Sequence, residues 1–205
     1  MLKVIREQVI HTDIFELGDE IKFKLTTGEK VHAKAVQECD GGMLFITKDC
    51  IGKEMPMYKN TSEKHLDYVH SDMRVYLNSE LLSLFPEKIR NRMRPMMVGD
   101  SCGDYIRIPT EKEIFGNNPY GIEESDTQQF YGMNYRRNRI AFEHTNGIDE
   151  WQWYWLQNYV ASRPRTTTSG ASFANVYDDG DADYLDASHS AGVRPVFTLA
   201  NKKVS

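Results

Sequence analysis

Residues 151–200 read WQWYWLQNYVASRPRTTTSGASFANVYDDGDADYLDASHSAGVRPVFTLA, and this stretch contains no lysine and no glutamate. Its charges are three arginines and five aspartates in a protein that is 27% charged overall, so it is neither a solvated helix nor a linker. All three tryptophans of the chain lie at its start. Aromatic residues, Ser, Thr, Asp and Gly dominate the rest, which predicts a compact, turn-rich β unit.

The aromatic start of this stretch fits a helix or a strand by its period alone. Trp151, Trp155 and Tyr159 would share a helix face, whereas Trp151, Trp153 and Trp155 would share a strand face. Three tryptophans and two tyrosines within nine residues favour the strand, because aromatic side chains fit a pleated surface.

A β-hairpin is expected next. Residues 172–177 alternate, the sequence Asp178-Asp179-Gly180 is a strong hairpin turn, and residues 182–187 form the returning strand. Residues 192–199 then close the domain as a further strand.

The N-terminal part also predicts antiparallel β structure. Apolar and charged residues alternate over residues 21–25 and 31–35, and the intervening Thr-Thr-Gly-Glu supplies a turn. A third apolar run follows at residues 43–46. The chain is therefore divided into an N-terminal β extension, residues 1–40, packed on a main domain, residues 41–205.

Two helices are expected in the main domain. The first begins after Ser71, a suitable N-cap, and places Leu77 and Leu81 on one apolar face. Pro86 can occupy the first turn of a second helix, which Pro95 would end.

Composition excludes several classes of protein. A 40% hydrophobic share over 205 residues can build a core, and a net charge of −5 argues against a nucleic-acid partner. Cys39, Cys50 and Cys102 are odd in number and lack C-x-x-C spacing, which favours reduced thiols. No segment approaches the roughly 20 apolar residues of a membrane helix, and the N-terminus has no signal-peptide run. We therefore expect a cytoplasmic protein, as synthesised, without membrane insertion.

Several strings carry a family resemblance. They are SDMRVYLN (residues 71–78), FPEKI (85–89), YIRIPTEKEIFG (105–116), YWLQNYVAS (154–162), FANV (173–176) and ASHSAGVRPVF (187–197). Together they resemble a widespread uncharacterised domain of bacteria and their phages and prophages, over roughly residues 40–199. The closing glycine-rich hairpin with G-V-R-P is similar to the end of C-type-lectin-like domains, such as formylglycine-generating enzymes and phage tropism determinants. The resemblance implies an α+β, C-type-lectin-like fold, with two helices against a twisted, mostly antiparallel sheet.

The surface of the terminal hairpin is the candidate ligand-binding site. Its residues are Tyr177, Asp179, Asp181, Asp183, Tyr184, Asp186 and His189. Tyrosine supplies rigid contact area and short polar side chains supply adaptable hydrogen bonds, a combination that antibody paratopes also use. In retroelement-diversified lectin-like proteins the varied positions lie in this terminal region, so the resemblance indicates the same surface. The alternative is that these residues only solvate an exposed β meander.

Metal binding and catalysis are not expected at this hairpin. Its five aspartates leave calcium as an alternative, since Ca²⁺ takes six to eight oxygen ligands, but the EF-hand pattern is absent. Alternation would also send Asp186 to the face opposite Asp181 and Asp183. His189 lies between two serines without a nucleophile elbow, and no cysteine follows Cys102 to match the reactive pair of formylglycine-generating enzymes. We predict no catalytic residue, no metal and no cofactor.

Trp151, Trp153, Trp155, Arg194 and Asn78 are predicted to be structural framework. The tryptophans belong mainly to the core, with at most one at a rim that could stack on a ligand. Arg194 could grip a carboxylate, but its place in G-V-R-P favours buried hydrogen bonds between sheet and loop. Asn78 is predicted to be a helix-cap or turn residue.

The leading functional prediction is a non-enzymatic ligand-recognition module, assembled into a phage or prophage tail or fibre. Its partner would be a cell-surface glycan or protein. Two alternatives stay open: an enzyme on the same scaffold, acting on a peptide or glycan, and a host-encoded structural or oligomerisation domain that forms a homo-oligomer. The enzyme alternative requires a concave pocket in which two or more titratable groups converge.

Overall fold

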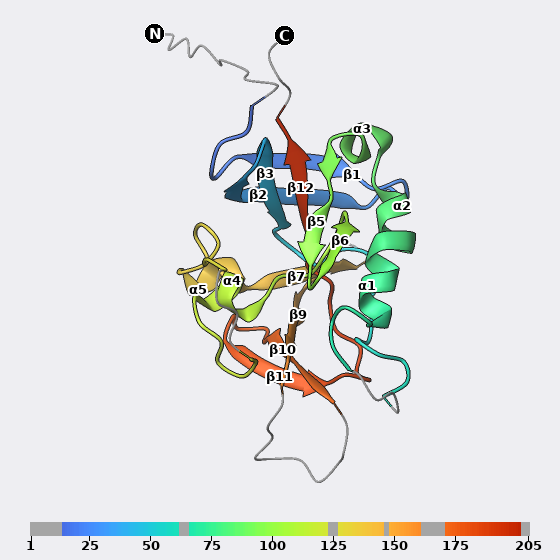
Figure 1. Cartoon of the computed structure of the whole chain (residues 1–205), viewed down its shortest axis with the longest axis vertical. Helices are drawn as coiled ribbons and strands as arrows, with labels where there is room; N and C mark the ends of the chain where they lie inside the picture. Colours follow the sequence, from blue (N-terminus) through green and yellow to red (C-terminus); the bar gives the residue numbers. More distant parts are fainter. Residues whose placement is uncertain (1–13, 62–65, 123–126, 146–147, 161–170, 202–205) are drawn as a thin grey trace.

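The computed structural model describes residues 14–61, 66–122, 127–145, 148–160 and 171–201. Strands account for 37% and helices for 16%, so the chain is mostly β (Figure 1). The expected α+β, C-type-lectin-like arrangement of two helices against one sheet is wrong. The structure instead has one curled antiparallel sheet, shaped as a half-barrel, and several small sheets.

The largest sheet has five strands in the order β1-β2-β3-β12-β4. These strands are β1 (Glu20–Lys24), β2 (Lys30–Cys39), β3 (Gly42–Thr47), β12 (Val196–Ala200) and β4 (Met93–Arg94). The predicted N-terminal hairpin is confirmed, because β1 and β2 pair antiparallel with Phe23 opposite Val31. The strand predicted at residues 192–199 begins only at Val196 and lies between β3 and β4.

A three-stranded sheet of β9 (Tyr154–Tyr159), β10 (Ser172–Val176) and β11 (Ala182–Asp186) forms the other large unit. The predicted hairpin is confirmed here, with Asn175 opposite Asp183. The predicted aromatic strand is also confirmed, although it breaks at Trp153 between β8 (Ile148–Gln152) and β9. β8 pairs with β7 (Ala141–Thr145), and β5 (Met96–Val98) pairs with β6 (Ser101–Asp104).

Only the first of the two predicted helices has the expected length. α1 (Asp72–Tyr76), η1 (Leu77–Leu81) and α2 (Leu82–Leu84) form one run of 13 residues. The Oγ atom of Ser71 caps this run by accepting the main-chain N–H of Arg74 at 3.1 Å.

The second predicted helix is shortened to α3 (Glu87–Arg90). It ends early because Met93 joins β4, pairs with Leu199 of β12 and buries its side chain, so tertiary pairing overrides local helix preference. The remaining helices, α4 (Glu111–Phe115) and α5 (Arg136–Arg139), are short. No helix within the described ranges is long and apolar enough to cross a membrane.

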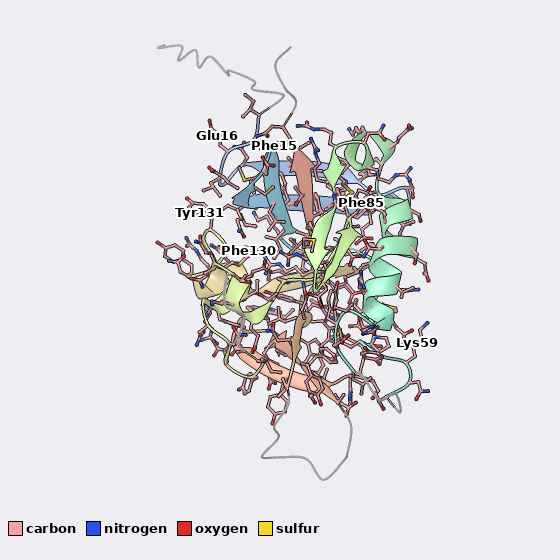
Figure 2. All side chains as sticks on the ribbon, in the orientation of Figure 1. Phe15, Glu16, Lys59, Phe85, Phe130 and Tyr131 are labelled. Atoms are coloured by element: carbon pink, nitrogen blue, oxygen red, sulfur yellow. The ribbon has the colours of Figure 1, made fainter. Side chains whose placement is uncertain are left out.

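Two hydrophobic clusters cover opposite faces of the curled sheet. Side chains alternate along the strands, so Phe45 and Phe197 enter the first cluster, while Leu44 and Ile46 enter the second. In Figure 2, Phe85 of the first cluster and Phe130 of the second lie to either side of β12. The first cluster also joins side chains of the N-terminal hairpin to the rest of the chain.

Candidate functional site

The turn of the terminal hairpin carries three of the predicted ligand-binding residues. Asp179 and Asp181 both form ion pairs with the guanidinium of Arg136, with N–O distances of 2.6 and 3.1 Å. Tyr177 is exposed and its ring is perpendicular to that of Trp153, with centroids 6.0 Å apart. The structure therefore gathers these residues around Arg136 and Trp153. One carboxylate oxygen of each aspartate is already paired with Arg136.

Of the other four predicted residues, Asp183, Tyr184 and Asp186 lie in β11, and His189 lies three residues beyond its end. Asp183 accepts the main-chain N–H of Tyr184 at 2.8 Å, and the ring of Tyr184 packs edge-on against Tyr120. Asp186 accepts both the N–H and the hydroxyl of Ser188, next to the exposed His189. At a rise of about 3.3 Å per residue, the five steps from Asp181 to Asp186 span roughly 17 Å. The seven residues therefore form a strip along β11 and not one compact cluster.

The residues of this strip do not line either of the two hollows beside the N-terminal hairpin. The described part of the chain also holds no group of three or more His, Cys, Asp or Glu side chains that could bind a metal ion. The aspartates instead complete turns and pair with Arg136.

The predicted framework residues differ widely in burial. Trp155 is fully buried and its Nε1–H donates to the carbonyl oxygen of Met55 at 2.8 Å. Trp153 is half-buried, and Trp151 is 58% exposed and packs on Phe142. Only one of the three tryptophans is therefore in the core.

Arg194 and Asn78 each make four side-chain hydrogen bonds to main-chain or side-chain groups. Arg194 is buried and all four acceptors are neutral oxygens, on residues 47, 138, 139 and 154. Asn78 links the helix to residues 105 and 106. No carboxylate contacts Arg194 within 4.0 Å among the described residues.

A cleft of about 720 Å³ lies beside the N-terminal hairpin, and the sequence did not reveal it. We call it the hairpin cleft. Its lining residues are Lys22, Phe23, Lys24, Glu29, Lys30, Val31, His32, Asp49, Ile51 and His144. Lys22, Lys24 and Lys30 are exposed, whereas the side chains of Phe23, Val31 and Ile51 are buried in the first core cluster. The volume lies within the roughly 300–1,000 Å³ typical of ligand sites.

Strand alternation explains why the rim is basic. Phe23 and Val31 point into the first core cluster, so Lys22, Lys24 and Lys30 point to the opposite face of the sheet. The second cluster covers that face at β3, β12 and Val36 in the second half of β2. β3 pairs with β2 only from Ala33 onward. The outer face of β1 and of residues 30–32 of β2 is therefore left open.

A second hollow of about 320 Å³ adjoins the cleft and shares Glu29, Ile51 and His144 with it. Gly192 lines this hollow, and a Cβ at this position would lie 2.6 Å from the Sγ atom of Cys50. The close approach accounts for the glycine of the G-V-R-P motif. Burial raises the pKa of the Cys50 thiol, so it is an unreactive thiol and not a nucleophile.

Glu29 and His144 are the titratable groups common to both hollows. Burial raises the pKa of the Glu29 carboxyl, although both of its oxygens accept the main-chain N–H of Gly52, at 3.1 and 3.2 Å. His144 lies between two carboxylates, with Nδ1 2.7 Å from Asp149 and Nε2 3.0 Å from Asp49. These bonds raise the pKa of His144 and occupy both ring nitrogens. Glu29 therefore differs from His144 in that its oxygens are bonded to a main-chain N–H and not to an oppositely charged side chain.

One signal for this site was readable in the sequence. In the predicted hairpin, Lys24 and Lys30 stand directly opposite each other, and like charges in such a pair are unfavourable. The partnership of His144 with Asp49 spans 95 positions and has no local signal.

The His144 bridge is expected to make the stability of the protein depend on pH. The folded pKa lies above the ordinary value of 6.5, so the stabilisation is complete below that value and is lost as the pH rises through the folded pKa. The difference in Tm between the wild type and His144→Gln should therefore shrink from about pH 6 to about pH 9. His189→Gln is the exposed control, and a His144→Gln difference that stays constant over this range would contradict the expectation.

Comparison with known proteins adds a family but no function. Residues 41–201 match the family described as Domain of unknown function (DUF6273). No curated protein and no solved structure matches the chain. The matched segment contains Asp49, Ile51 and His144 of the hairpin cleft, whereas β1 and β2 lie before it.

Proposed function

The chain belongs to the DUF6273 family, and we propose that it is a ligand-recognition domain whose binding site is the hairpin cleft. The observation that carries this proposal is the cleft itself: about 720 Å³ of space with exposed lysines, Glu29, Asp49 and two histidines in its lining. Ligand sites are usually concave and mainly apolar, with a few polar groups that fix orientation. Its place between the N-terminal hairpin and the family domain also suits such a site, because ligands often bind where two structural units meet.

An NMR titration with a fragment library tests the proposal. Amide shifts are expected to cluster at residues 22–24, 30–32 and 49–51. Lys24→Trp should fill part of the cleft with an indole and abolish these shifts, whereas Lys59→Trp, at an exposed site elsewhere, should leave them unchanged. Shifts that cluster at Tyr177–His189 would instead favour the terminal strip, which stays a second proposed contact surface.

Acid–base catalysis in the same cleft is a second candidate function. It is favoured by the raised pKa of Glu29, which lies beside His144 in the lining of both hollows. Glu29→Gln separates the two functions. A recognition domain would bind its ligand without changing it, whereas an enzyme would convert the ligand in the wild type and only bind it in Glu29→Gln.

The biological setting is a further part of the proposal. We propose recognition of a cell-surface glycan or protein by a phage or prophage particle, as the sequence resemblance implies. Gene neighbourhood tests this setting directly: tail genes beside this gene would support it, and a host metabolic operon would count against it.

A further inference from the structure

We propose that the β7–β8 hairpin is a pH-sensitive wall of the hairpin cleft, closed while the His144 ring is an imidazolium and loosened when the ring becomes neutral. The inference rests on the proposed function, because this wall borders the proposed binding site, and it adds regulation of that site. It follows from three features: how the β7–β8 hairpin is attached, what the His144 bridge requires, and which charges surround it.

The first feature is the attachment of the β7–β8 hairpin to Asp49. The main-chain N–H of Phe142 donates to Oδ1 of Asp49 at 3.2 Å, and the N–H of Cys50 donates to the carbonyl oxygen of Phe142 at 3.0 Å. Two positions further along β7, Nε2 of His144 lies 3.0 Å from Oδ2 of Asp49. His144 and Asp49 both line the hairpin cleft, so a change in this contact moves part of its lining.

The second feature is that only an imidazolium can complete the bridge. Nδ1 of His144 lies 2.7 Å from Asp149, which is directly opposite His144 in the β7–β8 hairpin. A neutral ring has one N–H, so it can donate to only one of the two carboxylates. The shorter contact is to Asp149, so we expect Nδ1 to keep the proton and Nε2 to turn a lone pair towards Asp49. Deprotonation therefore weakens the contact that joins the β7–β8 hairpin to the segment after β3.

The third feature is the set of charges around the ring. Besides Asp49 and Asp149, the charged or titratable groups on the neighbouring segments are Glu143 and Glu150 on the β7–β8 hairpin, Lys22, Lys24, Glu29, Lys30 and His32 in the cleft lining, and Lys53 and Glu54 in the adjoining hollow. Burial raises the pKa of the Glu29 carboxyl, and the charge of His144 acts in the opposite direction. A neutral His144 no longer offsets the repulsion between Asp49 and Asp149, which favours opening.

A purely local histidine–aspartate pair is the competing explanation. His70 forms such a pair, with Nδ1 2.8 Å from Asp67 three residues earlier, and it constrains only one turn. His144 differs because its contact with Asp49 joins segments 95 positions apart. Its protonation can therefore act on the position of the β7–β8 hairpin and not only on local stability.

Hydrogen exchange of the full chain measures this opening without a ligand. Between about pH 6 and about pH 9, the protection factors of the Phe142 and Cys50 amides should fall at least about tenfold, because the folded pKa of His144 lies above the ordinary value of 6.5. The amide of Phe45, in β3 between β2 and β12, should change less. An equal fall at Phe45 would mean global unfolding and would contradict the proposed wall.

Two variants predict opposite behaviour. His144→Gln cannot become an imidazolium, so its protection factors at Phe142 and Cys50 should be low at both pH values. His70→Gln is the matched control and should behave like the wild type. Asp49→Asn keeps Oδ1 for the Phe142 N–H and places an amide N–H opposite Nε2, which pairs with the neutral ring and not with the imidazolium. Its protection factors should therefore rise with pH.

Two results would overturn the pH-sensitive wall. The first is protection at Phe142 and Cys50 that does not change with pH in the wild type, and the second is an equal change in His144→Gln. The recognition cleft would still stand in either case, since the fragment titration tests it separately.

Discussion

Replacing Arg194 by lysine is expected to lower the free energy of unfolding by about 3–5 kcal/mol. The guanidinium is 3% exposed and donates to the carbonyl oxygens of Thr47, Asn138 and Arg139 and to the hydroxyl of Tyr154, at 2.8–3.1 Å. Lysine keeps the charge but not the planar fork, so several buried acceptors lose their donor. A cation that is buried without a carboxylate depends on these bonds and, here, on the ring of Tyr154, whose centroid lies 5.1 Å from Cζ.

Urea unfolding of the wild type and of the variant measures this loss, with Arg90→Lys as the matched control at an exposed site. Arg194→Lys should also weaken binding in the hairpin cleft. Thr47 lies two residues before Asp49, and Arg139 lies five residues before His144, so one guanidinium holds the two segments that carry the His144–Asp49 bridge. A loss below about 1 kcal/mol would contradict the expected role.

Local patterns predicted those parts of the fold that local interactions determine. The hairpins at residues 20–34 and 172–186 form as expected, because their turns and alternation lie within a few residues of each other. The second helix fails because Met93 gains more from pairing with β12, a strand more than 100 positions away, than from a further helical turn. No period in the sequence around residue 93 reports that pairing.

In the candidate sites, too, local features could be predicted from the sequence and long-range contacts could not. The composition of residues 177–189 correctly suggested a polar, partly exposed strand, but the ion pairs of Asp179 and Asp181 to Arg136 join segments about 43 positions apart. The hairpin cleft needs β1, β2, Asp49 and His144 at once. The strand pattern could show that Lys24 and Lys30 lie opposite each other. It could not show that Asp49 and His144 line the same cleft.

Replacing Asn78 by aspartate is expected to lower the free energy of unfolding by about 2–4 kcal/mol at neutral pH. The amide nitrogen donates to the carbonyl oxygens of Arg74 and Ile106 at 3.2 and 2.8 Å. The amide oxygen accepts the main-chain N–H groups of Tyr105 and Ile106 at 2.8 and 3.2 Å. Aspartate has nearly the same shape, so it keeps both acceptor contacts and turns both donor contacts into repulsion between oxygens.

The pH dependence of this loss identifies its cause. A carboxylate facing two carbonyl oxygens should have a pKa above the unfolded value of about 3.9, and its protonated form can again donate one hydrogen bond. The protein with Asn78→Asp should therefore lose less stability at about pH 4 than at about pH 7, because stability falls as the pH rises through the folded pKa. Urea unfolding at both pH values tests this, with Asn91→Asp as the exposed control. If the loss is the same at both pH values, altered packing explains it, and the donor role of Asn78 between the helix and the segment at Ile106 is wrong.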